Sequence, residues 1–340
     1  MKKTGCRRNG IFGAFAALLF LPLCSAAGCG TPPGVQTEQE DQAVGQEAEQ
    51  EAEPAVFRST VIPASPAPGE PVTIAVTPGF GVEKASLMAG SRRLGRATFF
   101  RVDPPGGKKP FLATVITVPS TVSADRLTIV LETADGTAGE IPLELSPREF
   151  RSETIRSTPA MAGIQADDSR EKTQQAEQLW AILNRVGDTA YYLGSFQSPL
   201  DYIYRTSAFG SRRVFVNPDG KTSTSIHAGG DYRAALGTWV FACGGGKVVM
   251  ARSRIVSGNS VMIEHLPGVY SIYYHLDSIR VAEGDLVKTG DILGLSGTTG
   301  YSTGPHLHWE VRVFGENTDP EAFVSRPLVD TDAVLSVLYP

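Results

Sequence analysis

This 340-residue sequence has only four cysteines, and their positions exclude a disulfide framework. Cys6, Cys24 and Cys29 lie close to the N-terminus, which leaves Cys243 alone in the remainder of the chain. The fold must therefore depend on its own hydrophobic core, and a chain of this length can bury one in each of about two domains. Because Cys243 adjoins a glycine run, we expect a small buried residue rather than a reactive thiol.

The sequence also lacks an excess of positive charge, and it lacks an apolar run that would cross a bilayer comfortably. The formal net charge is -5 at pH 7, which gives no reason to expect nucleic acid as a partner. The apolar run from Ile11 to Leu23 follows a cluster of lysines and arginines, which is the pattern of an export signal. We therefore predict a signal peptide over residues 1–28.

Residues 26–29, Ala-Ala-Gly-Cys, resemble a bacterial lipobox, in which the cysteine becomes the lipid-modified first residue of the mature protein. Ala26 is smaller than the aliphatic residue usual at that position, and simple cleavage after a small residue is the alternative. Acyl chains on Cys29 would give stable membrane anchoring. Gly30 follows the cysteine in place of Asp, which by analogy with enteric sorting favours the periplasmic face of the outer membrane in a bacterial envelope.

Composition then predicts a tether and a first folded domain. Residues 29–55 are rich in Gly, Pro, Gln and Glu and should form a disordered acidic tether. Residues 56–148 alternate runs of β-forming residues with turn residues, which predicts an immunoglobulin-like β-sandwich of roughly seven strands. This accessory domain has no histidine, and we expect no catalytic role for it. Its clearest signals are the strands 71–76, 112–118 and 126–132 and the hairpin turn Asp135-Gly136.

Residues 149–200 are predicted to form a helical connector. Asp168 is the expected N-cap, with Glu171 three residues later, and Gly187 ends the apolar pattern. We expect Trp180 on this pattern to pack against the protein rather than to bind a sugar. The residues at helical spacing are Ala176, Leu179, Trp180, Leu183 and Val186.

Residues 201–326 are expected to form a compact, antiparallel β domain, followed by a C-terminal tail at 327–340. Short strand-forming runs are separated by glycine-rich turns, with no periodic segment of helical length. The whole chain is therefore predicted to be mainly β. The runs that indicate strands are residues 239–242, 247–251, 260–265 and 270–275.

All five histidines lie in this last domain, and four form a metal-site pattern: His227 with Asp231, His275, and His306 with His308. Residues two apart on a strand share a face, so His306 and His308 can both reach one metal or one substrate. Glycines between His227 and Asp231 should let the backbone bend so that both side chains converge. Two imidazoles and a carboxylate on zinc leave a fourth position open, as in a catalytic site. This spacing does not decide whether His306 or His308 binds the metal.

The remaining histidine, His265, ends a predicted strand outside this pattern and is expected to have a structural role.

Residues 207 to about 323 contain a series of motifs in order: Ala208-Phe209-Gly210-Ser211-Arg212-Arg213, His227-Ala228-Gly229-Gly230-Asp231, Tyr274-His275-Leu276, the run 284–291 and the run from Gly297 to Glu310. In these motifs the segment strongly resembles the lysostaphin- and LytM-type zinc endopeptidases, which have a duplicated hybrid motif fold and cut peptidoglycan cross-links.

The resemblance implies that His227, Asp231 and His308 hold Zn2+, and that His275 and His306 are the catalytic histidines. Zinc lowers the pKa of bound water from about 15.7 towards roughly 7 and polarises a carbonyl. His275 and His306 can accept the proton, stabilise the oxyanion and protonate the departing amine. The sequence does not show which of the two histidines performs which of these tasks.

The function implied by the resemblance is hydrolysis of stem-peptide cross-links of peptidoglycan, with the D,D bond expected, in cell-wall remodelling. The alternative is an inactive relative that binds peptidoglycan or activates another murein hydrolase. Inactive members have lost ligand residues, whereas all five site residues are present in this sequence, which favours the enzyme.

Arg212 and Arg213 could contact acidic stem-peptide groups or pair within the domain. The sequence does not indicate the oligomeric state or whether the groove is covered.

Overall fold

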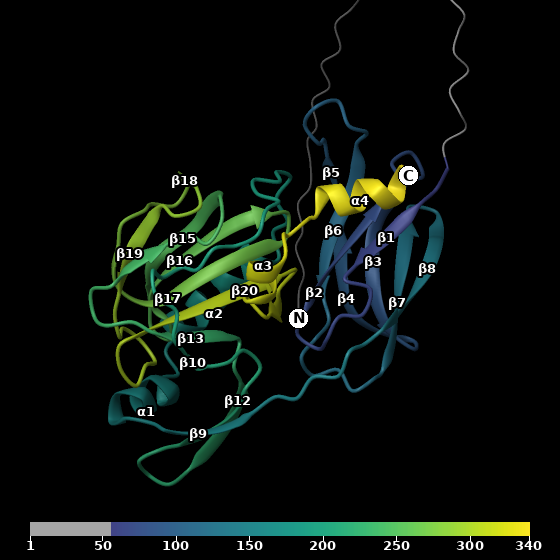
Figure 1. The fold of residues 1–340 in the computed structure, drawn as a ribbon. Coiled ribbons are helices and arrows are strands. Elements are labelled where there is room, and N and C mark those ends of the chain that lie inside the picture. The colour runs from purple at the N-terminus through teal and green to yellow at the C-terminus, as the bar shows by residue number, and fades with distance from the viewer. Residues whose placement is uncertain (1–55) are drawn as a thin grey trace, which may run out of the picture. The chain divides into compact units, whose positions relative to one another are not determined.

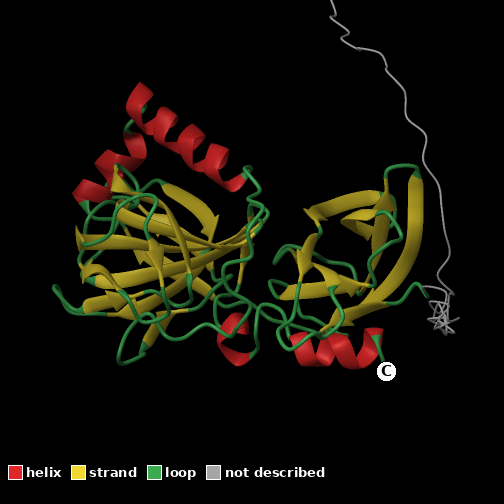
Figure 2. Cartoon of the chain, turned by 90° about the horizontal axis from the view of Figure 1, so that it is seen from above, coloured by secondary structure: helices red, strands yellow, loops and turns green. Residues whose placement is uncertain are grey.

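The computed structural model describes residues 56–340 (Figure 1). The predicted signal peptide, the acidic tether and Cys29 lie outside these residues. Strands make up most of the regular secondary structure of the described chain, with helices at its surface (Figure 2), as expected of a mainly β protein. Within residues 56–340, no helix is both long and apolar enough to cross a membrane.

The N-terminal part is a β-sandwich, which confirms the predicted architecture. Its core brings apolar side chains of two four-stranded sheets together, including Ile74 from one sheet and Leu87 and Ile129 from the other. The first sheet has the order β1 (Ser59–Ile62), β2 (Pro71–Val76), β6 (Phe111–Thr117) and β5 (Phe100–Val102). The second has the order β4 (Arg92–Thr98), β3 (Val82–Ala89), β7 (Arg126–Thr133) and β8 (Gly136–Glu144), with the expected hairpin between the last two.

Strand β2 is buried along its whole length because the sheet that contains it is covered on both faces. One face belongs to the sandwich core. On the other, the Thr73 hydroxyl donates to the Leu328 carbonyl over 2.8 Å, and Ala75 joins an apolar cluster that includes Phe323 and Leu328. The boundaries that the sequence placed at residues 148, 200 and 326 stay predictions.

The connector differs from the single helix that was predicted. It contains the strand β9 (Ser152–Arg156) and the helices α1 (Pro159–Ala166) and α2 (Arg170–Leu183). The N-cap of α2 is Ser169, whose hydroxyl accepts from the Lys172 N–H over 3.2 Å, so the prediction of Asp168 was wrong by one residue. Residues 167–169 lie between the two helices and belong to neither.

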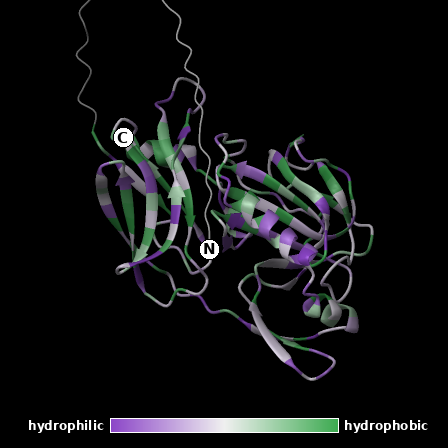
Figure 3. Cartoon of the chain, turned by 180° about the vertical axis from the view of Figure 1, so that it is seen from behind, coloured by the Kyte–Doolittle hydropathy of each residue, from purple (hydrophilic) through white to green (hydrophobic). Residues whose placement is uncertain are grey.

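Helix α2 lies on one face of the C-terminal sheet and turns a hydrophilic side outward (Figures 2 and 3). Leu179, Ile182 and Leu183 pack against apolar residues of the sheet such as Met262. Trp180 is 49% exposed and packs against the protein only in part, with the Arg312 guanidinium 5.8 Å from the centre of its ring. A helix on a sheet buries a narrow stripe, and Trp180 lies at the margin of that stripe.

The C-terminal domain is built on a ten-stranded sheet in which every pair is antiparallel. Its main path is β10 (Arg205–Ser207), β13 (Gly229–Arg233), β20 (His306–Val313), β17 (Val269–Ile279), β16 (Gly258–Leu266), β15 (Gly246–Arg254) and β18 (Leu286–Val287). Beside this path lie β14 (Trp239–Phe241), β19 (Ile292–Ser296) and β21 (Glu316–Thr318).

A separate three-stranded sheet departs from the antiparallel expectation. It joins the hairpin of β11 (Arg212–Val216) and β12 (Thr222–Ile226) to the connector strand β9, which runs parallel to β11. Beyond β21 the chain forms α3 (Ala322–Ser325) and α4 (Thr331–Leu338), so the segment predicted as a tail contains a helix. Asp330 caps α4, and the Leu338 carbonyl accepts from Arg58 over 3.1 Å.

The core of the C-terminal domain contains His265 and Cys243, both fully buried. Burial raises the pKa of the Cys243 thiol to about 12, which confirms the expectation of an inert, buried cysteine. His265 donates from Nδ1 to the Gly245 carbonyl over 2.7 Å, and its Nε2 lies 2.8 Å from the Ser271 hydroxyl oxygen. Burial favours the neutral form of this imidazole.

We predict that His265 makes the fold sensitive to acid. Burial lowers its pKa from 6.5 to about 4, so the unfolded chain binds the proton first as the pH falls. The contribution of neutral His265 is complete above pH 6.5 and should fall by about 3 kcal/mol on reaching pH 4. His265→Asn, which can keep the bond to Gly245, should show a smaller loss between those pH values in urea unfolding. An equal loss in variant and wild type would contradict this assignment.

Candidate metal centre

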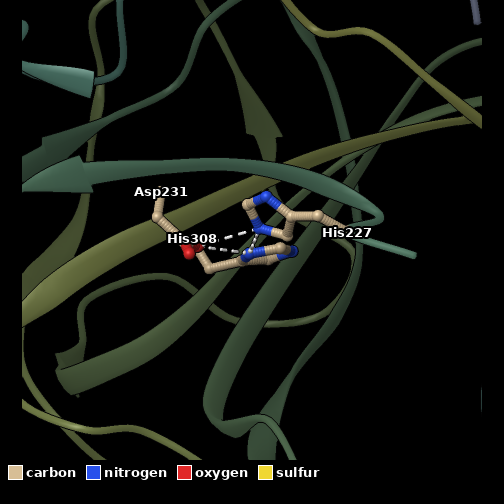
Figure 4. A group of neighbouring side chains, drawn as sticks. All are labelled: His227, Asp231 and His308. Atoms are coloured by element: carbon tan, nitrogen blue, oxygen red, sulfur yellow. Dashed lines mark hydrogen bonds and ion pairs between the residues drawn. The ribbon is translucent and has the colours of Figure 1, made fainter. Parts of the chain in front are cut away.

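Strands β13 and β20 bring two of the predicted ligands together. The register places Asp231 opposite His308, and His227 lies just before β13. His227 Nε2 lies 3.1 Å from Asp231 Oδ1 and 3.1 Å from His308 Nδ1, and that nitrogen lies 2.8 Å from the same carboxylate oxygen (Figure 4). These three ligand atoms lie within 4.8 Å of one another, which is close enough for all three to contact one metal ion.

The two histidines of β20 share a face, as their spacing predicted, but they occupy different positions. His308 completes the compact cluster, whereas His306 Nε2 lies 3.7 Å from Asp231 Oδ1 and its ring lies 4.8 Å from that of His275. The geometry therefore separates a group of three candidate ligands from a neighbouring pair of imidazoles.

Close packing, rather than a bend, explains the glycines before Asp231. Gly229 and Gly230 belong to β13, and neither has a positive φ. A Cβ on Gly229 would lie 2.2 Å from the Trp309 carbonyl oxygen, a distance that cannot be accommodated without moving the strand. The glycines thus let β13 approach β20, which sets the distance between Asp231 and His308.

Each candidate ligand is oriented by a further contact. His227 Nδ1–H donates to the Ala208 carbonyl over 2.8 Å, which leaves Nε2 facing the cluster. His308 Nε2–H donates to Glu310 Oε2 over 3.4 Å, which leaves Nδ1 facing the cluster. Asp231 accepts from Arg213 at Oδ2 and presents Oδ1. Such contacts fix the tautomer and the ring orientation of metal ligands.

The electrostatics of the cluster favour a positive charge at its centre. Burial opposes ionisation of Asp231, but hydrogen bonds from His227 and His308 outweigh it and hold the Asp231 pKa well below its ordinary value. Burial would lower the pKa of His308, but hydrogen bonds to Asp231 and Glu310 raise it to about 9. Burial lowers the pKa of His227. A site that attracts a proton to His308 this strongly also suits a cation.

His275 and His306 form a second pair beside the cluster. His275 has φ 61°, a left-handed conformation that is strained for a non-glycine residue and is typical of functional sites. Its Nδ1–H donates to the Thr299 carbonyl over 2.7 Å, and His306 Nδ1–H donates to the Gly304 carbonyl over 2.8 Å. Both rings therefore have Nε2 free to exchange a proton with a bound molecule.

The environment keeps His275 neutral. Burial and the neighbouring His306 and His308 lower its pKa to about 3, so its Nε2 holds no proton at neutral pH. The positive φ also breaks the alternation of β17, and the side chains of Tyr274 and His275, although adjacent, both line the same cavity. The Tyr274 ring stacks on that of His308 at 5.4 Å between ring centres.

The cluster lies between two cavities, of about 480 and 220 Å³, that share His275 and His308 as lining residues. Phe215 and Tyr301, whose rings meet edge to face at 5.5 Å, line both cavities. Helix α1 contributes Ile164 to the larger one and Met161 to the smaller. His275 and His308 can therefore be reached from both cavities.

The structure brings the five predicted site residues into one region, and the sequence analysis did not identify the residues that contact them. Glu310 could have been found, because it is two residues from His308 on the same strand and so shares its face. Phe215 carried no signal, since its role depends on how β11 folds over the site. Arg213 pairs within the protein, with Asp231 and Glu153, which is one of the two alternatives for the arginine pair.

Comparisons with known proteins agree with this geometry. Residues 225–320 match the family model described as peptidase family M23. The DD-carboxypeptidase/endopeptidase Mpg of Neisseria meningitidis is 41% identical over 122 residues, which are 36% of this chain and 27% of that protein. The peptidoglycan DD-endopeptidase ShyB of Vibrio cholerae is 40% identical over 123 residues, 36% of this chain and 28% of that protein. The chain thus spans little more than a quarter of these relatives.

A crystal structure of a Pseudomonas aeruginosa protein, described as an M23 peptidase candidate, matches a larger part of the fold. It is 22% identical, with a TM-score of 0.53, and the match covers 76% of this chain and 94% of that one. At this identity the likeness shows the fold alone. The family match, the similar relatives and the fold confirm the predicted resemblance, and residues 225–320 of this chain form a peptidase M23 domain of the LytM and lysostaphin type.

Proposed function

We propose that this protein is a zinc-dependent endopeptidase that hydrolyses peptide cross-links of peptidoglycan. The observation that carries the proposal is the cluster of His227, Asp231 and His308, with two further imidazoles beside it in a groove. Relatives that are named as peptidoglycan DD-endopeptidases support the choice of substrate and of the D,D bond.

The donor set of the cluster fits zinc. Two imidazole nitrogens and one carboxylate oxygen converge, all three are oriented by further hydrogen bonds, and zinc prefers such ligands in sites that keep a fourth position open. When bound by these residues, zinc would supply an acidified water and polarise a carbonyl.

The chain's own residues would manage the protons of the reaction. His275 Nε2 is neutral and unprotonated, so it can accept a proton from an attacking water. His306 Nε2 is held free by the bond from Nδ1 to Gly304, and it can stabilise developing negative charge or protonate a departing amine once it carries a proton. The division of these tasks between the two rings is part of the proposal.

The groove suits an extended peptide rather than a compact ligand. Apolar and aromatic side chains at its walls can contact peptide side chains and exclude water from the reacting bond, as Phe215 and Tyr301 do near the histidines. The alternative, an inactive protein that binds peptidoglycan or activates another hydrolase, does not account for a complete set of five oriented site residues.

The proposal places the enzyme in the bacterial envelope, anchored by acyl chains on Cys29, at the periplasmic face of the outer membrane. The lipobox-like residues 26–29 support this location, and the D,D cross-links of the cell's own wall would be within reach. We propose a role in wall remodelling on this basis.

Protein produced from residue 30 onward should bind about one zinc ion per chain. His308→Ala removes a ligand and should abolish stoichiometric binding, whereas His275→Ala should retain the metal because His275 lies outside the compact cluster. Elemental analysis after dialysis measures both. Full zinc content in His308→Ala would show that the ligand set is wrong.

Digestion of purified sacculi tests the reaction and identifies the bond. The wild type should release muropeptides whose masses correspond to cleavage of D,D cross-links. His275→Ala should retain zinc and lose roughly a hundredfold to ten-thousandfold in rate, the usual range for a general base. If the metal-loaded wild type released no fragments while binding sacculi tightly, the non-catalytic alternative would be favoured.

Acylation of Cys29 can be tested in bacterial cells that express the full chain. Cells fed an alkyne-labelled fatty acid should incorporate the label into the wild type, and the protein should fractionate with the outer membrane. Cys29→Ser should lose the label and leave the membrane fraction, while Cys243→Ser should keep both. Labelling of Cys29→Ser would contradict the proposed anchor.

A further inference from the structure

The connector strand β9 reaches the contacts that orient the metal ligands. In the parallel pairing of β9 with β11, Glu153 stands opposite Arg213. Residues paired in this way point to the same face of a sheet, and here that face borders the smaller cavity beside Asp231. Glu153 lies outside the segment matched by the family model, which begins at residue 225.

Glu153 contacts the residues that hold two of the three candidate ligands. Its Oε2 accepts from the Ser207 hydroxyl over 2.7 Å and lies 3.5 Å from Arg213 Nε. Ser207 Oγ in turn lies 3.2 Å from His227 Nδ1, and Arg213 donates to Asp231. One carboxylate thus connects, through one intervening side chain each, to both ligands.

The positive charge of Arg213 gives its contact with Glu153 an effect on metal binding. Its side chain is only 13% exposed, and its Nε has no hydrogen-bond partner within the described residues, so the guanidinium is poorly solvated. A guanidinium bonded to Asp231 repels a divalent cation bound by the same carboxylate. A second carboxylate beside Arg213 offsets that repulsion, and Glu153 Oε2 lies 3.5 Å from Arg213 Nε.

The connector is fixed against the hairpin independently of Glu153. The Arg212 N–H donates to the Arg151 carbonyl over 2.8 Å, and the Ser157 N–H donates to the Val216 carbonyl over 2.9 Å. The Arg212 guanidinium also lies over the Phe150 ring at 4.4 Å. Replacement of the Glu153 carboxylate should therefore leave β9 in place.

We infer that Glu153 is a positioning residue for the metal centre, which sets metal affinity by neutralising Arg213 and by holding Ser207 beside His227. The inference rests on the proposed metal site. It means that residues 201–326 alone are an incomplete metal site, because the connector supplies one of the contacts that orient the ligands.

The test compares zinc affinity of proteins from residue 30 onward by competition with a chromophoric chelator. Glu153→Gln keeps the shape and removes the charge, and it should weaken zinc binding by roughly tenfold to a hundredfold. Glu149→Gln is the matched control, since Glu149 lies in the same segment, is exposed, and makes no hydrogen bond or ion pair among the described residues. It should bind zinc as the wild type does.

Two further measurements separate positioning from a loss of folding. Cobalt, used in place of zinc, should give a shifted visible absorption spectrum in Glu153→Gln, while the metal-free proteins melt at the same temperature. If Glu153 acts through Arg213, the effect of Glu153→Gln should shrink when Arg213 is replaced by Met. Unchanged affinity in Glu153→Gln would overturn the inference, whereas a wild type that binds no zinc would overturn the proposed function itself.

Discussion

The pairing of β13 with β20 is the constraint on which the site depends. In this register Asp231 stands opposite His308, and a slip of one residue would turn one of them to the other face of the sheet. The close approach of Gly229 to the Trp309 backbone fixes the pairing, because a side chain there would force the strands apart. On the other side of β20, Tyr274 stands opposite His308 and stacks on it. The convergence of the candidate ligands Asp231 and His308 is therefore a consequence of strand register.

Each of the four imidazoles of the site is also oriented by a hydrogen bond to a group outside the ligand cluster. His227, His275 and His306 each donate from Nδ1 to a backbone carbonyl, and His308 donates from Nε2 to Glu310. Backbone carbonyls are fixed by the fold, so the tautomers are set before any ligand arrives. His227, His275 and His306 therefore present Nε2 to the site, whereas His308 presents Nδ1.

Much of this could be predicted from the sequence, and the limits have physical causes. Runs of β-forming residues between turn residues located seven of the strands, including β2 and β16, in which Ile74 and Val261 are fully buried. The histidines were recognisable because metal and proton chemistry requires those side chains. The parallel pairing of β9 with β11 was not predictable, since it joins residues about 60 apart in the sequence that carry no local signal. The exposure of Trp180 depends on how much of α2 the sheet covers, which the helical pattern does not state.

The connector contributes to the site from outside the family domain, since Glu153 contacts Ser207 and Arg213, which in turn contact His227 and Asp231.

The central claim is that His227 Nε2, Asp231 Oδ1 and His308 Nδ1 hold one metal ion. A crystal structure of the zinc-loaded protein, with anomalous diffraction collected at the zinc edge, tests it most directly. The account predicts a single peak within about 2.0–2.2 Å of those three atoms. A peak bonded to His306 or His275 in place of any of the three would contradict it.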